Sequence, residues 1–362
     1  MTYIVIIILL LYFGRQEKLY TLVKKKRFMC IFSLLFILLI GFRCIQTGQD
    51  TDMYGVIYSN LSRFNSYSSF MLDSDFENSI EFGYASWQWL IHLFFDYRGF
   101  LILQAVLMIV PFSYVVYKWS DDCRISFVLY ILLGYFTWDM CAARQAPAVS
   151  LTFLAYYFYC SKMYKKALVS YLVAISFHTT ALIFLPFVFG LRIIKKDQIL
   201  IISLIVAKLI GGVLIPIVLP YLRVDYSGDV QKGSVGQLTY FGFIALLFLM
   251  LYIKKQKRIE LPDSFYMFSY MMILWPLVDT VSAAFRITFY FMIYLCLAIP
   301  SIMKALKLQK QRSLLIVYKI FCICILSVYF YNMHYGNLGR HVYPYYSMFE
   351  YSDNSAKTIY KD

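Results

Sequence analysis

Long apolar runs separated by short polar segments recur along this chain of 362 residues. Runs of about 17 to 25 apolar residues are long enough to cross a bilayer as helices. Hydrophobic side chains make up 61% of the residues, and mean hydropathy is +0.65. The short alternating segments of a β-barrel are not visible. The pattern predicts an all-α, polytopic integral membrane protein, with residues 1–362 forming a single membrane domain.

The charges follow the ends of these runs. The net charge is +14, and basic residues beside apolar segments signal orientation in the membrane rather than nucleic-acid binding. The segment 15–27, RQEKLYTLVKKKR, carries six basic residues and one Glu, so we expect it to be cytoplasmic. The apolar segment 1–14 precedes its charges, which indicates a retained helix rather than a cleaved signal peptide. The N-terminus is then outside, and the segment about 28–45 runs outward.

The remaining topology follows from this start. We expect an acidic external loop at about 47–84. The apolar stretch 85–95 is too short to span, and we expect it either to lie in the membrane interface or to re-enter. The C-terminal segment, about 332–362, is expected outside. The further predicted spans lie at about 100–117, 125–138, 145–159, 198–222, 237–253, 264–284, 286–303 and 313–331.

The segment 167–191 contains a single ionisable residue, His178, between basic clusters. If it crosses once, the chain has eleven spans, and the basic segments 192–197 and 254–258 are external. If it enters and turns back near His178, both segments are cytoplasmic, as the positive-inside rule favours. We therefore expect ten full spans and a re-entrant pair. Such a break is tolerated where the backbone is buried in protein or lines a wet cavity.

Four ionisable residues within or beside apolar runs are candidates for function: Arg144, His178, Asp279 and Arg286. Each costs about 2.5 to 3.5 kcal/mol to insert. On the re-entrant topology all four lie toward the outside and converge with the acidic loop on one external cavity. Structural alternatives are a hydrogen-bonded histidine, snorkelling arginines and an Asp279–Arg286 pair that locks two helices.

Several motifs are absent from the sequence. There is no Walker A, GxSxG or HExxH motif, and no CxxC pair or Cys/His cluster with zinc spacing. Asp50 and Asp52 form an Asp-x-Asp, but no nucleotide-binding βαβ pattern surrounds them. We therefore expect no metal and no cofactor.

Several segments together resemble the EpsG family, the Wzy-like membrane proteins of bacterial exopolysaccharide gene clusters. The resemblance covers roughly residues 40–350. Its motifs, in chain order, are GQDTDMYGVIY (48–58), EFGYASWQWL (81–90), ARQAPAVSLTFLAYYF (143–158), VAISFHTTALIFLPF (173–187), FRITFYF (285–291) and YPYYSMF (343–349).

The resemblance implies a GT-C-like glycosyltransferase that polymerises lipid-linked oligosaccharide repeat units. The reaction would take place at the outer face of the bacterial cytoplasmic (inner) membrane, for exopolysaccharide, capsule or O-antigen. The substrate would be an oligosaccharide on a polyprenyl diphosphate such as undecaprenyl diphosphate. A flippase and a chain-length regulator would be its partners in the bilayer, with no nucleic acid.

The residue types suit that chemistry. Arg144 and Arg286 are candidates for pairing with a departing diphosphate. His178 is the candidate base, with Asp52 and Glu81 as rivals. Residues expected to bind substrate are Asp50, Tyr54, Tyr84, Gln145, Asp279, Arg340 and Tyr343.

Other classes stay open at this point. A polytopic polysaccharide O-acetyltransferase would also use a histidine and an arginine in a membrane. A lipid-linked oligosaccharide flippase or transporter would use a cavity that opens alternately to both sides. A structural partner in an export complex would leave the polar residues dispensable.

Overall fold

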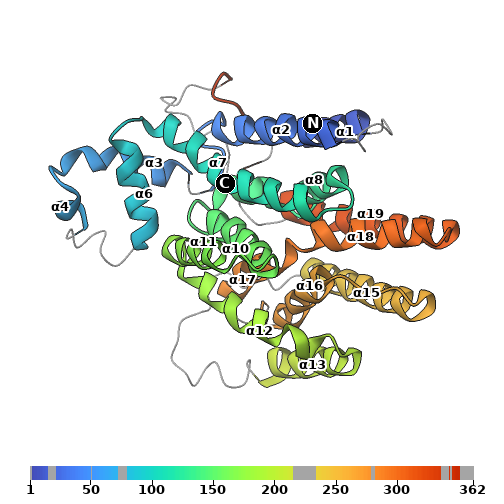
Figure 1. The fold of residues 1–362 in the computed structure, drawn as a ribbon. Coiled ribbons are helices and arrows are strands. Elements are labelled where there is room, and N and C mark those ends of the chain that lie inside the picture. Colours follow the sequence, from blue (N-terminus) through green and yellow to red (C-terminus); the bar gives the residue numbers. More distant parts are fainter. Residues whose placement is uncertain are drawn as a thin grey trace. The chain divides into compact units, whose positions relative to one another are not determined.

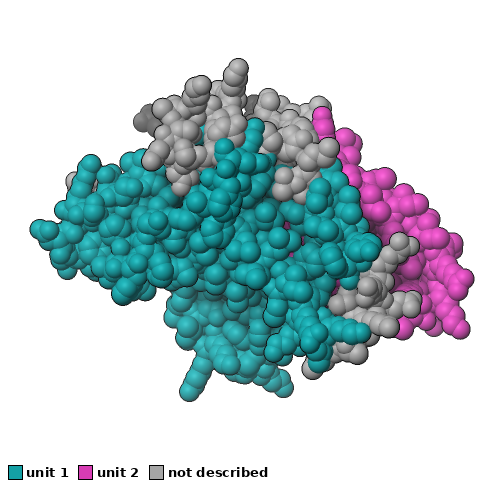
Figure 2. All heavy atoms as spheres, turned by 90° about the horizontal axis from the view of Figure 1, so that it is seen from above, with its two compact units in different colours: residues 1–119, 134–182, 333–362 teal, residues 120–133, 183–332 magenta. Residues whose placement is uncertain are grey.

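The computed structural model describes residues 2–14, 22–49, 51–71, 80–214, 234–278, 282–335, 342 and 345–350. Every regular element in these ranges is a helix, and the one β-contact there is an isolated bridge between Arg43 and Ser347. The all-α class is confirmed. The chain divides into two compact units, coloured separately in Figure 2. Unit 1 comprises residues 1–119, 134–182 and 333–362, and unit 2 comprises 120–133 and 183–332.

The body of unit 1 is built from helices of 13 to 23 residues. These are α1 (Thr2–Gly14), α2 (Leu22–Gly41), α7 (Tyr97–Trp119), α10 (Gln145–Cys160) and α11 (Tyr164–Phe177). Helix α7 packs against α2 and α10, and α10 packs against α11. The ammonium of Lys25, near the start of α2, lies over the ring of Tyr117, near the end of α7. Helices α2 and α7 are therefore antiparallel.

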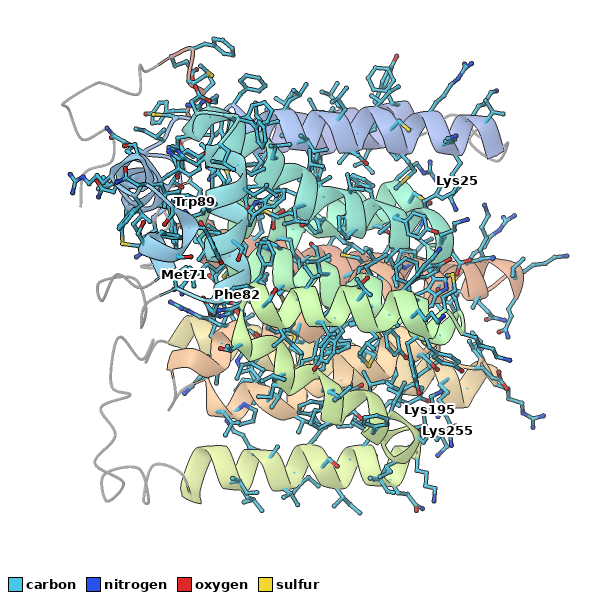
Figure 3. The ribbon with its side chains drawn as sticks, turned by 60° about the vertical axis from the view of Figure 1, so that its left-hand side comes forward. Lys25, Met71, Phe82, Trp89, Lys195 and Lys255 are labelled. Carbon is cyan, nitrogen blue, oxygen red and sulfur yellow. The ribbon has the colours of Figure 1, made fainter. Side chains whose placement is uncertain are left out.

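Short helices form one end of unit 1. They are α3 (Thr51–Asn60), η2 (Leu61–Arg63), α4 (Tyr67–Met71), α6 (Phe82–His92) and α9 (Tyr135–Cys141). The described part of the expected external loop is thus largely helical. Figure 3 shows Met71, Phe82 and Trp89 at this end and Lys25 at the opposite end of the unit. That separation agrees with a basic cytoplasmic end and an external end.

The predicted break at His178 is confirmed. Helix α11 ends at Phe177, and His178 is extended, with φ −158° and ψ 118°. A 3-10 turn, η3 (Thr179–Ile183), and α12 (Phe184–Ile194) follow it. An extended residue cannot continue an α-helix, because it does not carry the helical backbone hydrogen bonds forward.

The chain doubles back after this break. The Tyr171 hydroxyl, two turns before His178, donates to the carbonyls of Ala181 and Leu182 at 3.1 and 3.2 Å. The residues that follow His178 therefore lie beside α11 instead of extending its axis.

Unit 2 is also helical. Besides α12 it contains α8 (Cys123–Leu132), α13 (Asp197–Leu209), a π-turn η4 (Ile210–Leu214), α15 (Ser234–Lys257), α16 (Asp263–Leu274), η6 (Trp275–Leu277), α17 (Ser282–Met292), α18 (Leu295–Leu308) and α19 (Arg312–Tyr335) (Figure 1). The predicted single span at 125–138 is divided: α8 ends at Leu132, and Gly134 takes a left-handed φ of 77° before α9 begins.

Ion pairs gather the basic segments of unit 2 at one end. Lys195 pairs with Asp263 at 2.6 Å, and Lys254 pairs with Asp197 at 2.5 Å. Figure 3 shows Lys195 beside Lys255. The segments 192–197 and 254–258 therefore lie on the same side of the membrane.

A further ion pair tests the two topologies. Lys304 lies 2.6 Å from Asp121, and Gln309 donates to the carbonyl of Lys257 at 3.0 Å. A single crossing at 167–191 would place Asp121 inside and Lys304 outside. Because the two side chains touch, the contact favours the re-entrant arrangement.

Four helical stretches among the described residues are long and apolar enough to cross a membrane: Tyr97–Trp119, Gln237–Lys257, Ala284–Leu308 and Arg312–Met333. Shorter apolar helices cover Tyr3–Phe13, Cys123–Leu132 and Thr179–Ile194. A polytopic membrane protein is thereby supported. The count of ten or eleven spans stays a prediction, since several expected spans consist of shorter pieces.

Candidate functional site

Three of the predicted residues meet at the end of unit 1 that is expected to be external. The carboxylate of Glu81 accepts a hydrogen bond from Nη1 of Arg144 at 2.7 Å. Its other oxygen lies 2.6 Å from Nδ1 of His178. The side chains are 15% exposed for Glu81, 27% for Arg144 and 13% for His178. The cluster is therefore sheltered but open to a ligand, most of all at Arg144.

Close packing of two helices brings Glu81 to His178. Glu81 directly precedes α6, and Ser176 lies near the end of α11. A Cβ atom at Gly83 would lie 2.1 Å from the Ser176 hydroxyl and 2.7 Å from its backbone carbonyl carbon. Only glycine permits this approach, so Gly83 sets how closely Glu81 can approach the histidine.

The Glu81 contact determines which nitrogen of His178 carries the proton. An ionised carboxylate accepts a hydrogen bond, so Nδ1 is the protonated nitrogen of the neutral ring. Nε2 then keeps its lone pair, and it has no hydrogen-bond partner among the described residues. The histidine is thus arranged to accept a proton at Nε2.

Glu81 itself is held in its charged form. Burial raises the pKa of this carboxyl, but the hydrogen bond from His178 and the charge of Arg144 outweigh burial and lower the pKa to about 2. A carboxylate with so low a pKa, and with both oxygens engaged, is a weak base. Glu81 therefore orients its two neighbours, and His178 is the better candidate for the base.

A tyrosine pair supports Arg144 from the other side. Nε of Arg144 donates to the Tyr54 hydroxyl at 3.0 Å, and the Tyr54 ring meets the Tyr84 ring edge-on at 5.6 Å between centroids. Both tyrosines are buried. Tyr54 therefore holds the arginine and Tyr84 packs against Tyr54, and the substrate-binding role expected of the two tyrosines stays a prediction.

Two buried polar residues that sequence analysis did not single out hold this end together. The guanidinium of Arg43 donates to the carbonyls of Ile40, Thr47 and Met140 at 2.6, 3.0 and 3.2 Å, and to the Thr51 hydroxyl at 3.3 Å. It joins the end of α2 to the start of α3 and the end of α9. Helices α3 and α9 place Tyr54 and Arg144, so Arg43 supports their contact.

The second residue is Gln104, in the middle of α7. It accepts a hydrogen bond from the Trp87 indole at 2.8 Å and donates to the carbonyl of Ala143, the residue before Arg144. Gln104 and Arg43 could each have been found in the sequence as a single polar residue inside an apolar run. Polar groups buried in a membrane protein need such partners.

The remaining residues that the sequence singled out differ in position and exposure. Asp52, on α3, is exposed and accepts from the backbone N–H of Met53 at 2.8 Å. Gln145 is buried at the start of α10. Arg286 is exposed on α17 of unit 2, so its convergence with Arg144 stays a prediction. The predicted residues outside the described ranges are Asp50, Asp279, Arg340 and Tyr343.

The described residues contain no group of three or more His, Cys, Asp or Glu side chains that could hold a metal ion. Cys44 and Cys141 are both buried, and no disulfide joins them. The cluster itself presents a guanidinium, a carboxylate and an imidazole.

The fold and the cluster define a multi-pass α-helical membrane protein with an ion-paired polar site at the end of unit 1 opposite Lys25. A family model confirms the resemblance seen in the sequence. The chain belongs to the EpsG family, whose model matches residues 26–351 and whose members are Wzy-like, polymerase-type membrane proteins. Neither the search of curated proteins nor that of solved structures found a match.

Proposed function

We propose that this protein polymerises lipid-linked oligosaccharide repeat units by glycosyl transfer from a polyprenyl diphosphate. The observation that carries the proposal is the bridge that Glu81 makes between Arg144 and His178. It places a cation suited to a diphosphate beside an imidazole suited to a hydroxyl. Family membership supports a polymerase role in general.

The reaction would use the two outer members of the bridge. A sugar hydroxyl of the incoming repeat unit attacks the anomeric carbon of the growing chain, and Nε2 of His178 takes the hydroxyl proton. The bond between the anomeric carbon and the phosphate oxygen breaks, and the polyprenyl diphosphate leaves with the bonding electrons. The guanidinium of Arg144 stabilises the negative charge on that leaving group. His178 then releases its proton to water.

Glu81 would act through its neighbours. It fixes the ring orientation of His178 and stabilises the imidazolium that forms when Nε2 gains a proton. Asp52 is exposed on the same short helix as Tyr54, and we assign it to binding sugar hydroxyls. Arg286 remains a second candidate for the diphosphate.

The proposed reaction also implies a cellular setting. The site belongs at the outer face of a bacterial cytoplasmic membrane, in the synthesis of exopolysaccharide, capsule or O-antigen. A flippase would deliver the lipid-linked repeat unit, such as an undecaprenyl diphosphate oligosaccharide, and a chain-length regulator would act on the product.

The test is the size and mass of lipid-linked glycans in cells that lack this protein. Single repeat units that accumulate outside the membrane, with loss of polymer, are expected. Full-length polymer lacking an acetyl group would instead identify an O-acetyltransferase. Accumulation only on the cytoplasmic side would identify a flippase. Complementation with His178→Ala and Arg144→Ala then distinguishes a catalytic site from a scaffold. If the protein is only a scaffold, both variants restore polymer; if the site is catalytic, neither does.

A further inference from the structure

Helix α6 has apolar side chains on both of its faces. Tyr84, Ala85 and Ile91 are buried against unit 1. On the opposite face, Phe82 is 64% exposed and Leu90 is 50% exposed. A helix that packs on a protein from the aqueous phase carries polar residues on its outer face. Ser86 lies between Phe82 and Leu90, and its hydroxyl hydrogen-bonds with the Tyr67 hydroxyl of α4 at 2.7 Å. The part of the outer face that α4 leaves open, at Phe82 and Leu90, is apolar and suits an apolar environment.

The exposed apolar surface continues beyond the end of α6. Leu93, Phe94 and Phe95 are 58%, 73% and 52% exposed. The next helix, α7, starts at Tyr97 and is one of the stretches long and apolar enough to cross the membrane. The three side chains thus directly precede a helix that could cross the membrane, and they add to the exposed apolar surface of α6.

The direction of α6 fits a place at the membrane surface. In Figures 1 and 3 the helix runs across the direction of α2, at the end of unit 1 opposite Lys25. If α2 crosses the membrane, α6 lies along its plane.

We propose that α6 and residues 93–95 form an interfacial anchor, with the outer face of the helix seated among the phospholipids of the outer leaflet. Amphipathic helices of this kind bury their apolar face about 5–10 Å into the boundary between headgroups and acyl chains. Glu81 directly precedes the anchor, so the anchor fixes the depth of Glu81 in the membrane. If the proposed function holds, that depth is where the diphosphate of a lipid-linked substrate lies.

The anchor can be tested without measuring activity. The photoreactive amino acid benzoylphenylalanine is placed at Phe94 in the full-length protein, which exchanges one exposed aromatic ring for another. A second variant carries it at Leu90, on the outer face of α6. The control carries it at Ser62, an exposed position on η2. After irradiation of native membranes, cross-linked products are identified by mass.

We expect phospholipid adducts at Phe94 and Leu90, about tenfold more abundant than at Ser62, because only the first two positions would reach the acyl chains. Adducts to another protein or to a second copy of this chain, without lipid, would overturn the proposal. So would lipid adducts no more abundant than at Ser62. The Leu90 variant keeps the test available if the Phe94 variant does not accumulate, and neither result depends on whether the protein is a polymerase.

Discussion

Nδ1 of His178 lies 2.6 Å from the carboxylate of Glu81, although 97 residues separate the two in the chain. The same carboxylate pairs with Arg144. One acidic residue thus joins the start of α6, the start of α10 and the end of α11. The orientation of His178 and the placement of Arg144 both depend on this shared carboxylate. Each contact around it can be tested separately.

Replacing Glu81 with Gln should reduce polymer formation by roughly 10- to 100-fold, the size of effect seen when a carboxylate that orients a histidine is removed. The amide keeps the shape but loses the charge that stabilises a protonated ring. The measurement is chain elongation by purified protein in liposomes. Glu260→Gln, at an exposed acid of unit 2, is the control. Equal activity of wild type and Glu81→Gln would contradict the assigned role.

Arg144→Lys should be nearly as damaging as Arg144→Ala, because an ammonium cannot reproduce the fork that contacts Glu81 and Tyr54 together. Loss of a charged hydrogen bond, about 1.5–3 kcal/mol, corresponds to roughly 10- to 100-fold in rate. Tyr54→Phe should cost less, since the ion pair with Glu81 remains. The elongation assay again applies, with Arg192→Lys, an exposed change, as the control. Full activity of Arg144→Lys would show that charge alone suffices.

Gly83→Ala should separate Glu81 from His178, since the added methyl group overlaps the backbone of Ser176. Overpacking of this kind costs about 1–3 kcal/mol, so thermal stability in detergent and activity should both fall. Gly212→Ala is the matched control, because a Cβ there meets no heavy atom within 4 Å. If the two alanine variants behave alike, α6 is not held as closely as the structure indicates.

The pH dependence of stability follows from the lowered pKa of Glu81. A carboxyl whose pKa falls from 4.5 to about 2 on folding contributes its full stabilisation above the unfolded value and loses it as pH falls through the folded value. The difference in melting temperature between wild type and Glu81→Gln should therefore not shrink between pH 8 and pH 5. A difference that vanishes by pH 5 would refute the pairing.

Lys310→Gly should stabilise the protein. Lys310 follows α18 with a left-handed φ of 56°, a conformation that costs an L-residue about 1–2 kcal/mol relative to the right-handed one. Glycine removes that cost. Gly134→Ala, at a φ of 77°, should have the opposite effect. Thermal unfolding in detergent measures the stability of both variants. If Lys310→Gly is destabilised, the contacts of the lysine side chain stabilise the fold by more than its left-handed backbone conformation costs.

Much of the fold could be predicted from the sequence because the signals are local. Hydrophobic runs predict spans, and basic segments predict the cytoplasmic side. The break at His178 was visible as a lone ionisable residue in an apolar run. The division between α8 and α9 was not anticipated, because the left-handed conformation of Gly134 is a property of the backbone that its neighbours did not indicate.

The candidate site was predicted in part. Arg144, His178 and Glu81 were each singled out by residue type and position. Their roles were not settled, because Asp52 and Glu81 remained rivals to His178 as the base. Arg43 and Gln104 were passed over, since a single polar residue in an apolar run does not reveal its partners.

The sequence by itself determined that this protein is a multi-pass membrane protein and singled out Arg144, His178 and Glu81. Hydrophobicity and charge are local properties, so each segment shows by itself whether it favours lipid or water. Only the tertiary structure decided that Glu81, rather than Asp52, joins Arg144 to His178. That choice depends on how closely α6 packs on α11 at Gly83 and Ser176, a contact between segments far apart in the chain.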